Sequence, residues 1–104
     1  MSSKKLYNTD YELHASVKML FPYISNIVPN SGSVSGGLSV TINGQNFTDV
    51  NTVKFGGTNA TSFTLVNSNQ LIARTPAYSH TGIVDVTIIS PFGTATAHGG
   101  FTYI

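Results

Sequence analysis

The stretch that decides the fold runs from Pro22 to Gly44 and reads PYISNIVPNSGSVSGGLSVTING. Its first β-rich run, Tyr23–Val28, ends at a proline and is followed by glycine and serine residues that favour turns. A second run, residues 38–42, alternates apolar and polar side chains, and Asn43-Gly44 closes it. We therefore predict two short strands separated by turns, with one face of the second strand buried.

The chain after Gly44 continues in the same way. Further β-rich runs punctuated by glycine, asparagine and proline cover residues 53–55, 60–66, 71–74, 83–89 and 94–103. About seven short strands at a spacing of roughly 8–12 residues, with no helical stretch of useful length, are typical of a sandwich. We predict an all-β, immunoglobulin-like antiparallel β-sandwich.

The core of this sandwich can be predicted from the same alternation. Val84, Val86 and Ile88 share one face of their run, which we expect to be buried. Gly44 is expected to take a positive φ angle, so that Phe47 folds back onto one end of the core. The residues expected to pack between the two sheets are Phe55, Ile72, Val86, Ile88 and Phe101.

These residues also carry a resemblance to a known family. Residues 22–32, Gly36-Gly37, residues 40–44 and Phe47 are similar to the opening of an IPT/TIG domain. This is the immunoglobulin-like module of plexins, Rel-type transcription factors, starch-acting enzymes and microbial surface proteins. The later landmarks keep the family's order: Val53–Gly56, Ala73–Pro76, Gly82 before Val84–Val86, and Phe101–Tyr103. The resemblance covers residues 22–104 and differs from the plexin type, which bears cysteines, and from the Rel type, which has basic DNA-contacting loops. It implies a scaffold and leaves the ligand open.

Composition excludes several classes of protein. With 104 residues there is room for one domain, and only 9% of them are charged. The net charge of +1 argues against nucleic acid, and 40% hydrophobic residues argue against disorder. Zero cysteines removes disulfides, cysteine-ligated zinc and thiol nucleophiles. No apolar window of about 18 residues exists, so we expect no membrane insertion.

Residues 1–21 lie outside the resemblance and form a predicted N-terminal arm. A strand is favoured because every odd position from 11 to 21 is apolar: Tyr11, Leu13, Ala15, Val17, Met19 and Phe21. A helix is the alternative, since Thr9 with Glu12 resembles a capping box. Leu13, Val17 and Leu20 also lie at helical spacing. The arm could join the sandwich as an extra strand, be the end of a linker, or dock on the free sheet edge of a neighbour.

The ionisable residues of the sandwich do not form a catalytic pattern. General acid–base catalysis needs two groups that converge on a pocket, whereas we place Asp49 in a loop and Asp85 on the outer face of a strand. Ser79-His80 lacks the surroundings of a nucleophile, and the histidines have no metal-ligand spacing. We predict a protein that is not an enzyme, with no catalytic residue, no cofactor and no metal.

Binding is then the expected chemistry, and loop tips are its usual place in a sandwich. The predicted topology groups residues 45–51 with 90–94 at one end, and 30–35, 56–59 and 77–81 at the other. Exposed aromatic side chains among small polar residues stack on sugars or anchor protein interfaces, although both loop aromatics could instead fold onto their own sheets. The candidate interaction residues are Tyr11, Leu13, Val17, Met19, Phe21, Tyr78 and Phe92.

The predicted function follows from context. A small, nearly neutral, polar sandwich with no evident secretion signal fits a phage virion structural protein, displayed on the particle as a capsid decoration (cement) or as a tail or fibre accessory and docked through its N-terminal arm. Its partners would be capsid or tail proteins, neighbouring surface proteins, or host-surface glycans. The alternative is an extracellular or cell-surface module, either an adhesion module from a bacterial receptor or a carbohydrate-associated module of a glycan-degrading enzyme.

Overall fold

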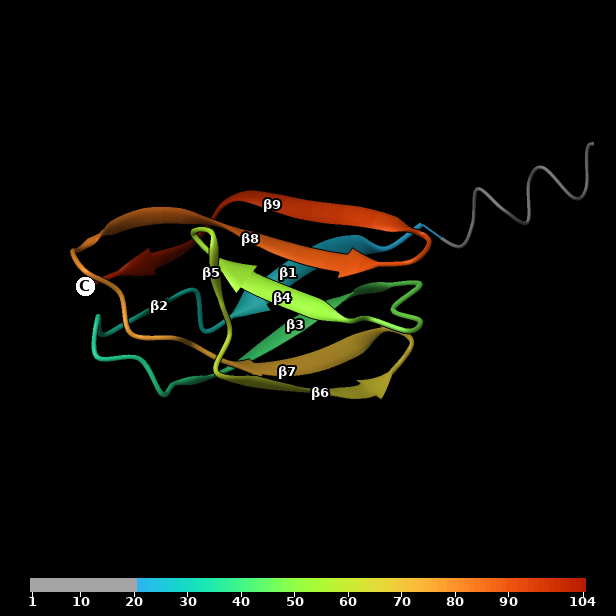
Figure 1. The fold of residues 1–104 in the computed structure, drawn as a ribbon, viewed down its shortest axis with the longest axis horizontal. Helices are drawn as coiled ribbons and strands as arrows, with labels where there is room; N and C mark the ends of the chain where they lie inside the picture. The colour runs from blue at the N-terminus through green and yellow to red at the C-terminus, as the bar shows by residue number, and fades with distance from the viewer. Residues whose placement is uncertain (1–20) are drawn as a thin grey trace, which may run out of the picture.

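The computed structural model describes residues 21–104 as two β-sheets packed face to face (Figure 1). One sheet has the strand order β1-β3-β7-β6 and the other β2-β9-β8-β4-β5. In this range every regular element is a strand, and the predicted all-β sandwich is confirmed. The strands are β1 (Tyr23–Val28), β2 (Ser31–Gly32), β3 (Ser39–Gln45), β4 (Thr52–Phe55), β5 (Thr58–Asn59), β6 (Ser62–Asn67), β7 (Gln70–Arg74), β8 (Gly82–Ser90) and β9 (Gly93–Tyr103).

The strands match the predicted runs except at two places. Two-residue strands, β2 and β5, bring the number to nine, and β2 pairs with β9 in parallel, so the sandwich is not purely antiparallel. The last residue is tied into this pairing, since the Ile104 amide donates to the Gly32 carbonyl at 2.8 Å. Phe21 lies beside Gly93 at the β8–β9 turn, whereas the C-terminus with Ile104 lies at the opposite end of the sandwich (Figure 1).

The prediction for Gly44 was wrong in its reason. β3 continues through Asn43-Gly44 to Gln45, and the positive φ angle belongs to Asn46, at 62°. Gly44 is required for space instead, because a Cβ atom there would overlap the carbonyl oxygen of Tyr23 on β1. Phe47 does fold back onto the core as predicted and is 1% exposed.

The predicted core is confirmed except at Ile72. Phe55 and Phe101 meet edge to face with ring centroids 5.3 Å apart, and both are buried. Ile72 is 39% exposed because the register of β7 places Leu71 and Ala73 inward and Ile72 on the outer face. The side chains of β8 alternate as predicted, with Val84, Val86 and Ile88 buried.

The two long sides of the sandwich are closed to different degrees. On one side β1 lies beside β9, and the Ile27 side chain covers Gly100, where a Cβ atom would stand 2.9 Å from Ile27 Cδ1. On the other side β6 ends its sheet, opposite the short β5. We call these the closed side and the open side.

No helix in the described part of the chain is long and apolar enough to cross a membrane. The predicted arm lies outside the described residues apart from Phe21.

Candidate interaction surfaces

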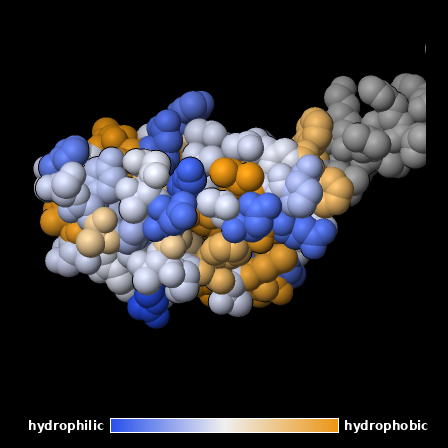
Figure 2. Space-filling model, in the orientation of Figure 1, coloured by the Kyte–Doolittle hydropathy of each residue, from blue (hydrophilic) through white to orange (hydrophobic). Residues whose placement is uncertain are grey.

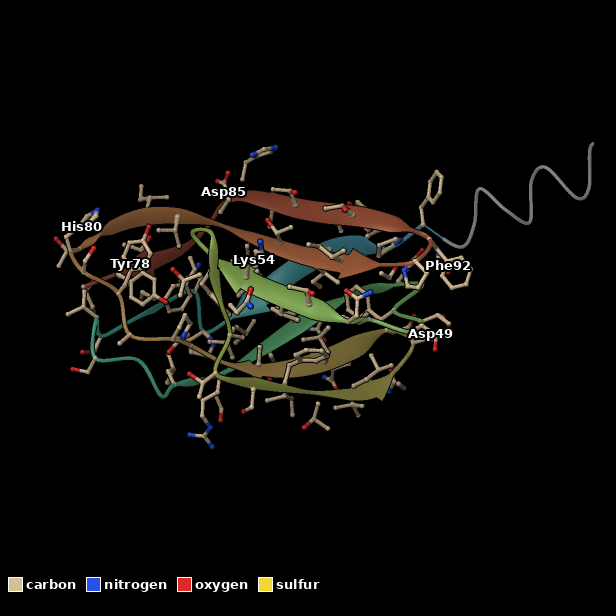
Figure 3. All side chains as sticks on the ribbon, viewed as in Figure 1. Asp49, Lys54, Tyr78, His80, Asp85 and Phe92 are labelled. Carbon is tan, nitrogen blue, oxygen red and sulfur yellow. The ribbon has the colours of Figure 1, made fainter. Side chains whose placement is uncertain are left out.

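The predicted grouping of loops at two ends of the sandwich agrees with the positions of four labelled side chains. Asp49 and Phe92 lie at one end and Tyr78 and His80 at the other (Figure 3). Phe92 is half-buried, and its amide donates to Ser90 Oγ at 3.2 Å within the β8–β9 turn. The apolar tip predicted at Phe92 is therefore only partly exposed.

Phe21 lies at the same end as Phe92. Its side chain is 54% exposed and its carbonyl accepts a hydrogen bond from Asn46 Nδ2 at 3.1 Å. The Phe21 ring also approaches Gly93, where a Cβ atom would be 3.3 Å from Phe21 Cδ1. This end thus offers one exposed and one half-buried aromatic ring. Of the other candidate interaction residues, Tyr11, Leu13, Val17 and Met19 lie outside the described residues.

Tyr78, the candidate at the opposite end, is a packing residue as well. Its ring stacks on Tyr103 with centroids 4.7 Å apart and an interplanar angle of 4°. Tyr103 is 1% exposed and donates its hydroxyl to the Pro76 carbonyl at 2.9 Å. Burial, and to a smaller extent the neighbouring Tyr78, raises the pKa of the Tyr103 hydroxyl. One face of the Tyr78 ring is covered, so it is poorly placed to stack on a ligand.

The charged groups are dispersed over the sandwich. Asp85 lies on the outer face of β8 as predicted and accepts hydrogen bonds from the Gly99 amide at 2.8 Å and from His98 Nδ1 at 3.4 Å. The Gly99 amide, with smaller help from His98, holds the pKa of the Asp85 carboxyl below its ordinary value. Asp49 sits in a loop with a φ angle of 54°. Within residues 21–104 no three histidine or acidic side chains gather as a metal site would require.

A surface that the sequence reading did not single out is the outer face of the sheet β1-β3-β7-β6. Three amide side chains cross it from strand to strand: Asn43 Nδ2 donates to Asn26 Oδ1 at 2.8 Å, and Gln70 Nε2 donates to Asn43 Oδ1 at 3.2 Å. We call Asn26, Asn43 and Gln70 the amide row. It is flanked by exposed apolar side chains: Tyr23 at 61%, Val28 at 57% and Ile72 at 39%.

A bulge in β1 creates the amide row. Ile24 pairs with Gly44 and Asn26 pairs with Asn43, so one extra residue, Ser25, is accommodated between them. Without the bulge, strict alternation would turn Asn26 inward and Ile27 outward. With it, Ile24 and Ile27 both pack against the core, and Asn26 lies beside Asn43.

Charge is scarce on this face. β1, β3 and β7 contain a single charged residue, Arg74, whose Nη1 donates to the Gly37 carbonyl at 2.9 Å at the edge of the face. The face therefore suits a neutral polar partner better than an ion.

Comparison with known proteins gives a single family. The family model of the IPT/TIG domain matches residues 22–103. The chain is 34% identical over 97 residues to Protein SPT23 of Saccharomyces cerevisiae, a match that covers 90% of this chain and 8% of that protein. The chain thus spans less than a tenth of the length of this curated relative.

Solved structures repeat the fold inside larger proteins. SGBP-B from a complex xyloglucan utilization locus in Bacteroides uniformis superposes with a TM-score of 0.63 at 26% identity, covering 77% of this chain and 22% of that one. The full extracellular region of plexin A4 superposes with a TM-score of 0.69 at 26% identity, covering 78% of this chain and 8% of that one.

Proposed function

We propose that this chain, which belongs to the IPT/TIG domain family, is a non-catalytic module of a larger surface-displayed protein. We propose further that it binds neutral carbohydrate across the outer face of the sheet β1-β3-β7-β6. IPT/TIG domains are typically non-enzymatic interaction modules.

The amide row is the observation that carries the proposal. Among the hydrogen bonds of residues 21–104, Asn26 Nδ2 and Gln70 Oε1 have no partner, so the row ends in free donors on one strand and a free acceptor on another. Sugar hydroxyl groups both donate and accept, which matches this pattern. Because the three side chains hold one another in place, a ligand would lose less free energy in ordering them.

An aromatic ring lies on the same face. Tyr23 pairs with Gln45, and the next outward pair along these strands is Asn26 with Asn43, a distance of about 7 Å along the strand. An exposed tyrosine ring gives a sugar ring an apolar face to stack on while the amides bind its hydroxyls. Tyr23 would therefore serve as the stacking platform and the amide row as the polar contact.

The comparisons support a surface setting. SGBP-B is named for a xyloglucan utilization locus, and plexin A4 is represented by its extracellular region. None of SGBP-B, plexin A4 and Protein SPT23 is named as a virion protein, so the virion role expected from composition stays a prediction. Docking through residues 1–21 stays a prediction as well.

Calorimetric titration of the full chain with soluble xyloglucan tests the proposal, with polygalacturonate as the charged control polymer. We expect weak binding of xyloglucan and none of polygalacturonate. Tyr23→Ala and Asn43→Ala should each weaken binding about tenfold, a typical cost of losing a central contact.

Phe92→Ala and Tyr78→Ala are the matched controls. Both remove an aromatic ring, as Tyr23→Ala does, but from a loop at an end of the sandwich, away from the amide row. If Phe92→Ala abolishes binding and Asn43→Ala leaves it unchanged, the ligand sits at the loop end and the proposed face is wrong. If a panel of neutral glycans gives no binding, carbohydrate is the wrong ligand class.

A further inference from the structure

The open side of the sandwich ends in an unprotected strand. Among the described residues, β6 pairs with β7 alone, so its other edge carries unpaired backbone groups. Its sequence, SFTLVN, contains neither a charged residue nor a proline. Edge strands are usually protected against pairing by such residues, by a bulge or by a covering segment. The register shift after Leu65 affects only the end of β6.

The core is incomplete behind this edge. Leu65 pairs with Leu71 on β7 and points to the same, inner side of the sheet, yet Leu65 is 40% exposed where Leu71 is 0% exposed. Phe63 is half-buried, although its partner Ala73 is 0% exposed. Both side chains face the core and stay accessible because β6 is the last strand of its sheet.

A small groove lies between Phe63, near the start of β6, and the strands β4 and β5 of the facing sheet. Its volume is about 110 Å³, and Phe63 and Val53 contribute apolar side chains to it from the two sheets. Figure 2 shows hydrophobic side chains gathered on this side of the molecule, where β6 lies in Figure 1. A strand added to β6 would direct alternate side chains into the groove, because facing sheets are about 10 Å apart and side chains alternate along a strand. The remaining lining residues are Asn51, Thr52, Asn59 and Ala60.

The chain itself contains a segment with the required pattern. From Tyr11 to Phe21 the odd positions are all apolar, whereas Glu12 and Lys18 stand at even positions. Paired with β6, this segment would put its apolar face into the groove and its charged residues toward solvent. Eleven residues span about 36 Å as a strand, more than the six residues of β6 need.

The geometry favours a second molecule as the source of the added strand. Phe21 leads into β1, which lies at the far edge of the same sheet, three strand spacings or about 14 Å from β6. A segment from the same molecule would use several residues to cross that width, and a neighbouring molecule avoids the crossing. We propose that the open side accepts, as an added strand beside β6, residues 11–21 of a second copy of this chain.

Sedimentation of the full chain without carbohydrate tests this proposal independently of the proposed function. We expect self-association that Leu65→Lys weakens about tenfold or more, because the added strand would bury the new charge. Thr64→Lys is the matched control: it places the same charge one residue away, on the outer face of β6, and should change the dissociation constant less than about twofold. Thermal unfolding verifies that both variants fold.

Mixed disulfides identify the contact. Since the natural chain contains zero cysteines, molecules carrying Leu65→Cys can be mixed with molecules carrying Leu13→Cys, Val17→Cys or Met19→Cys and then oxidised. We expect at least one mixed pair to cross-link. The proposal is wrong if the chain stays monomeric up to about 1 mM, if Leu65→Lys associates like wild type, or if cross-links form only when both cysteines are in one molecule.

Discussion

The closed and open sides of the sandwich meet the same physical requirement by different means. On the closed side Ile27 covers the backbone at Gly100 and is itself 9% exposed. On the open side Leu65, which also points inward, is 40% exposed. The difference shows that an inward direction does not guarantee burial, because burial depends on whether another element lies beyond the strand.

Gly44→Ala should have the largest effect on the closed side. A methyl group there would overlap the Tyr23 carbonyl and would stand 2.6 Å from Phe47 Cζ, so β1 must separate from β3. We expect a loss of more than about 3 kcal/mol in the free energy of unfolding, measured by urea denaturation. Gly57→Ala is the control, because a Cβ atom there would have no neighbouring atom within 4 Å. Only the φ angle of 84° is unfavourable for alanine at that position. A loss there equal to that of Gly44→Ala would contradict the steric explanation.

Truncation of one inward side chain on each side compares the two directly. Ile27→Ala should cost about 2–4 kcal/mol, because a buried isoleucine leaves a cavity under β1. Leu65→Ala should cost about 1 kcal/mol or less in the monomer, since much of the side chain is already in water. Equal losses, measured at a concentration where the chain is monomeric, would mean that the open side is covered in solution.

Removal of two tyrosine hydroxyls tests the packing at one end of the sandwich, where both sides meet. Tyr103→Phe would leave the buried Pro76 carbonyl without its 2.9 Å hydrogen bond and should cost about 1–2 kcal/mol. Tyr78→Phe loses only a 3.4 Å bond to the Gly56 carbonyl at a half-buried position and should cost about 0.5 kcal/mol or less. Chemical denaturation of both variants checks the order, and the reverse order would contradict it.

The smallest expected effect comes from Asp85, which belongs to neither side. Its pKa is lowered in the folded protein, chiefly by the Gly99 amide, so its contribution to stability is present above its ordinary pKa of 3.8 and is lost as the pH falls below it. Thermal unfolding between pH 7 and pH 2.5 should therefore show a shallower decline for Asp85→Asn than for wild type. Identical curves would contradict this contribution.

Much of the fold could be predicted because local signals and tertiary packing agree in it. The strands could be located from apolar alternation, as in Val84, Val86 and Ile88, and from the turn residues around each run. The same residues were sufficient to recognise the IPT/TIG family. Ile72 was misplaced because its orientation depends on the register of β7 against β3, which the sequence of β7 alone does not determine.

The candidate surfaces were harder to predict. The amide row depends on a one-residue bulge in β1, and neither Asn26 nor Asn43 signals its partner across the sheet. The open side depends on which strand is last in the sheet, a property of topology that β6 does not carry in its own residues. The loop aromatics Tyr78 and Phe92 could be identified from the sequence because the residue type itself marks them. Their partial burial could not, since it depends on tertiary packing such as the stacking of Tyr78 on Tyr103.

The parallel pairing of β2 with β9 has a mechanical consequence. Because Phe21 and Ile104 lie at opposite ends of the sandwich, a pull between them acts along β1 and β9 rather than across them (Figure 1). The hydrogen bonds that join β9 to β2 and β8, and β1 to β3, would then be loaded in shear and would have to break together. Within a longer chain under tension, this domain would transmit force as a stiff segment and yield abruptly.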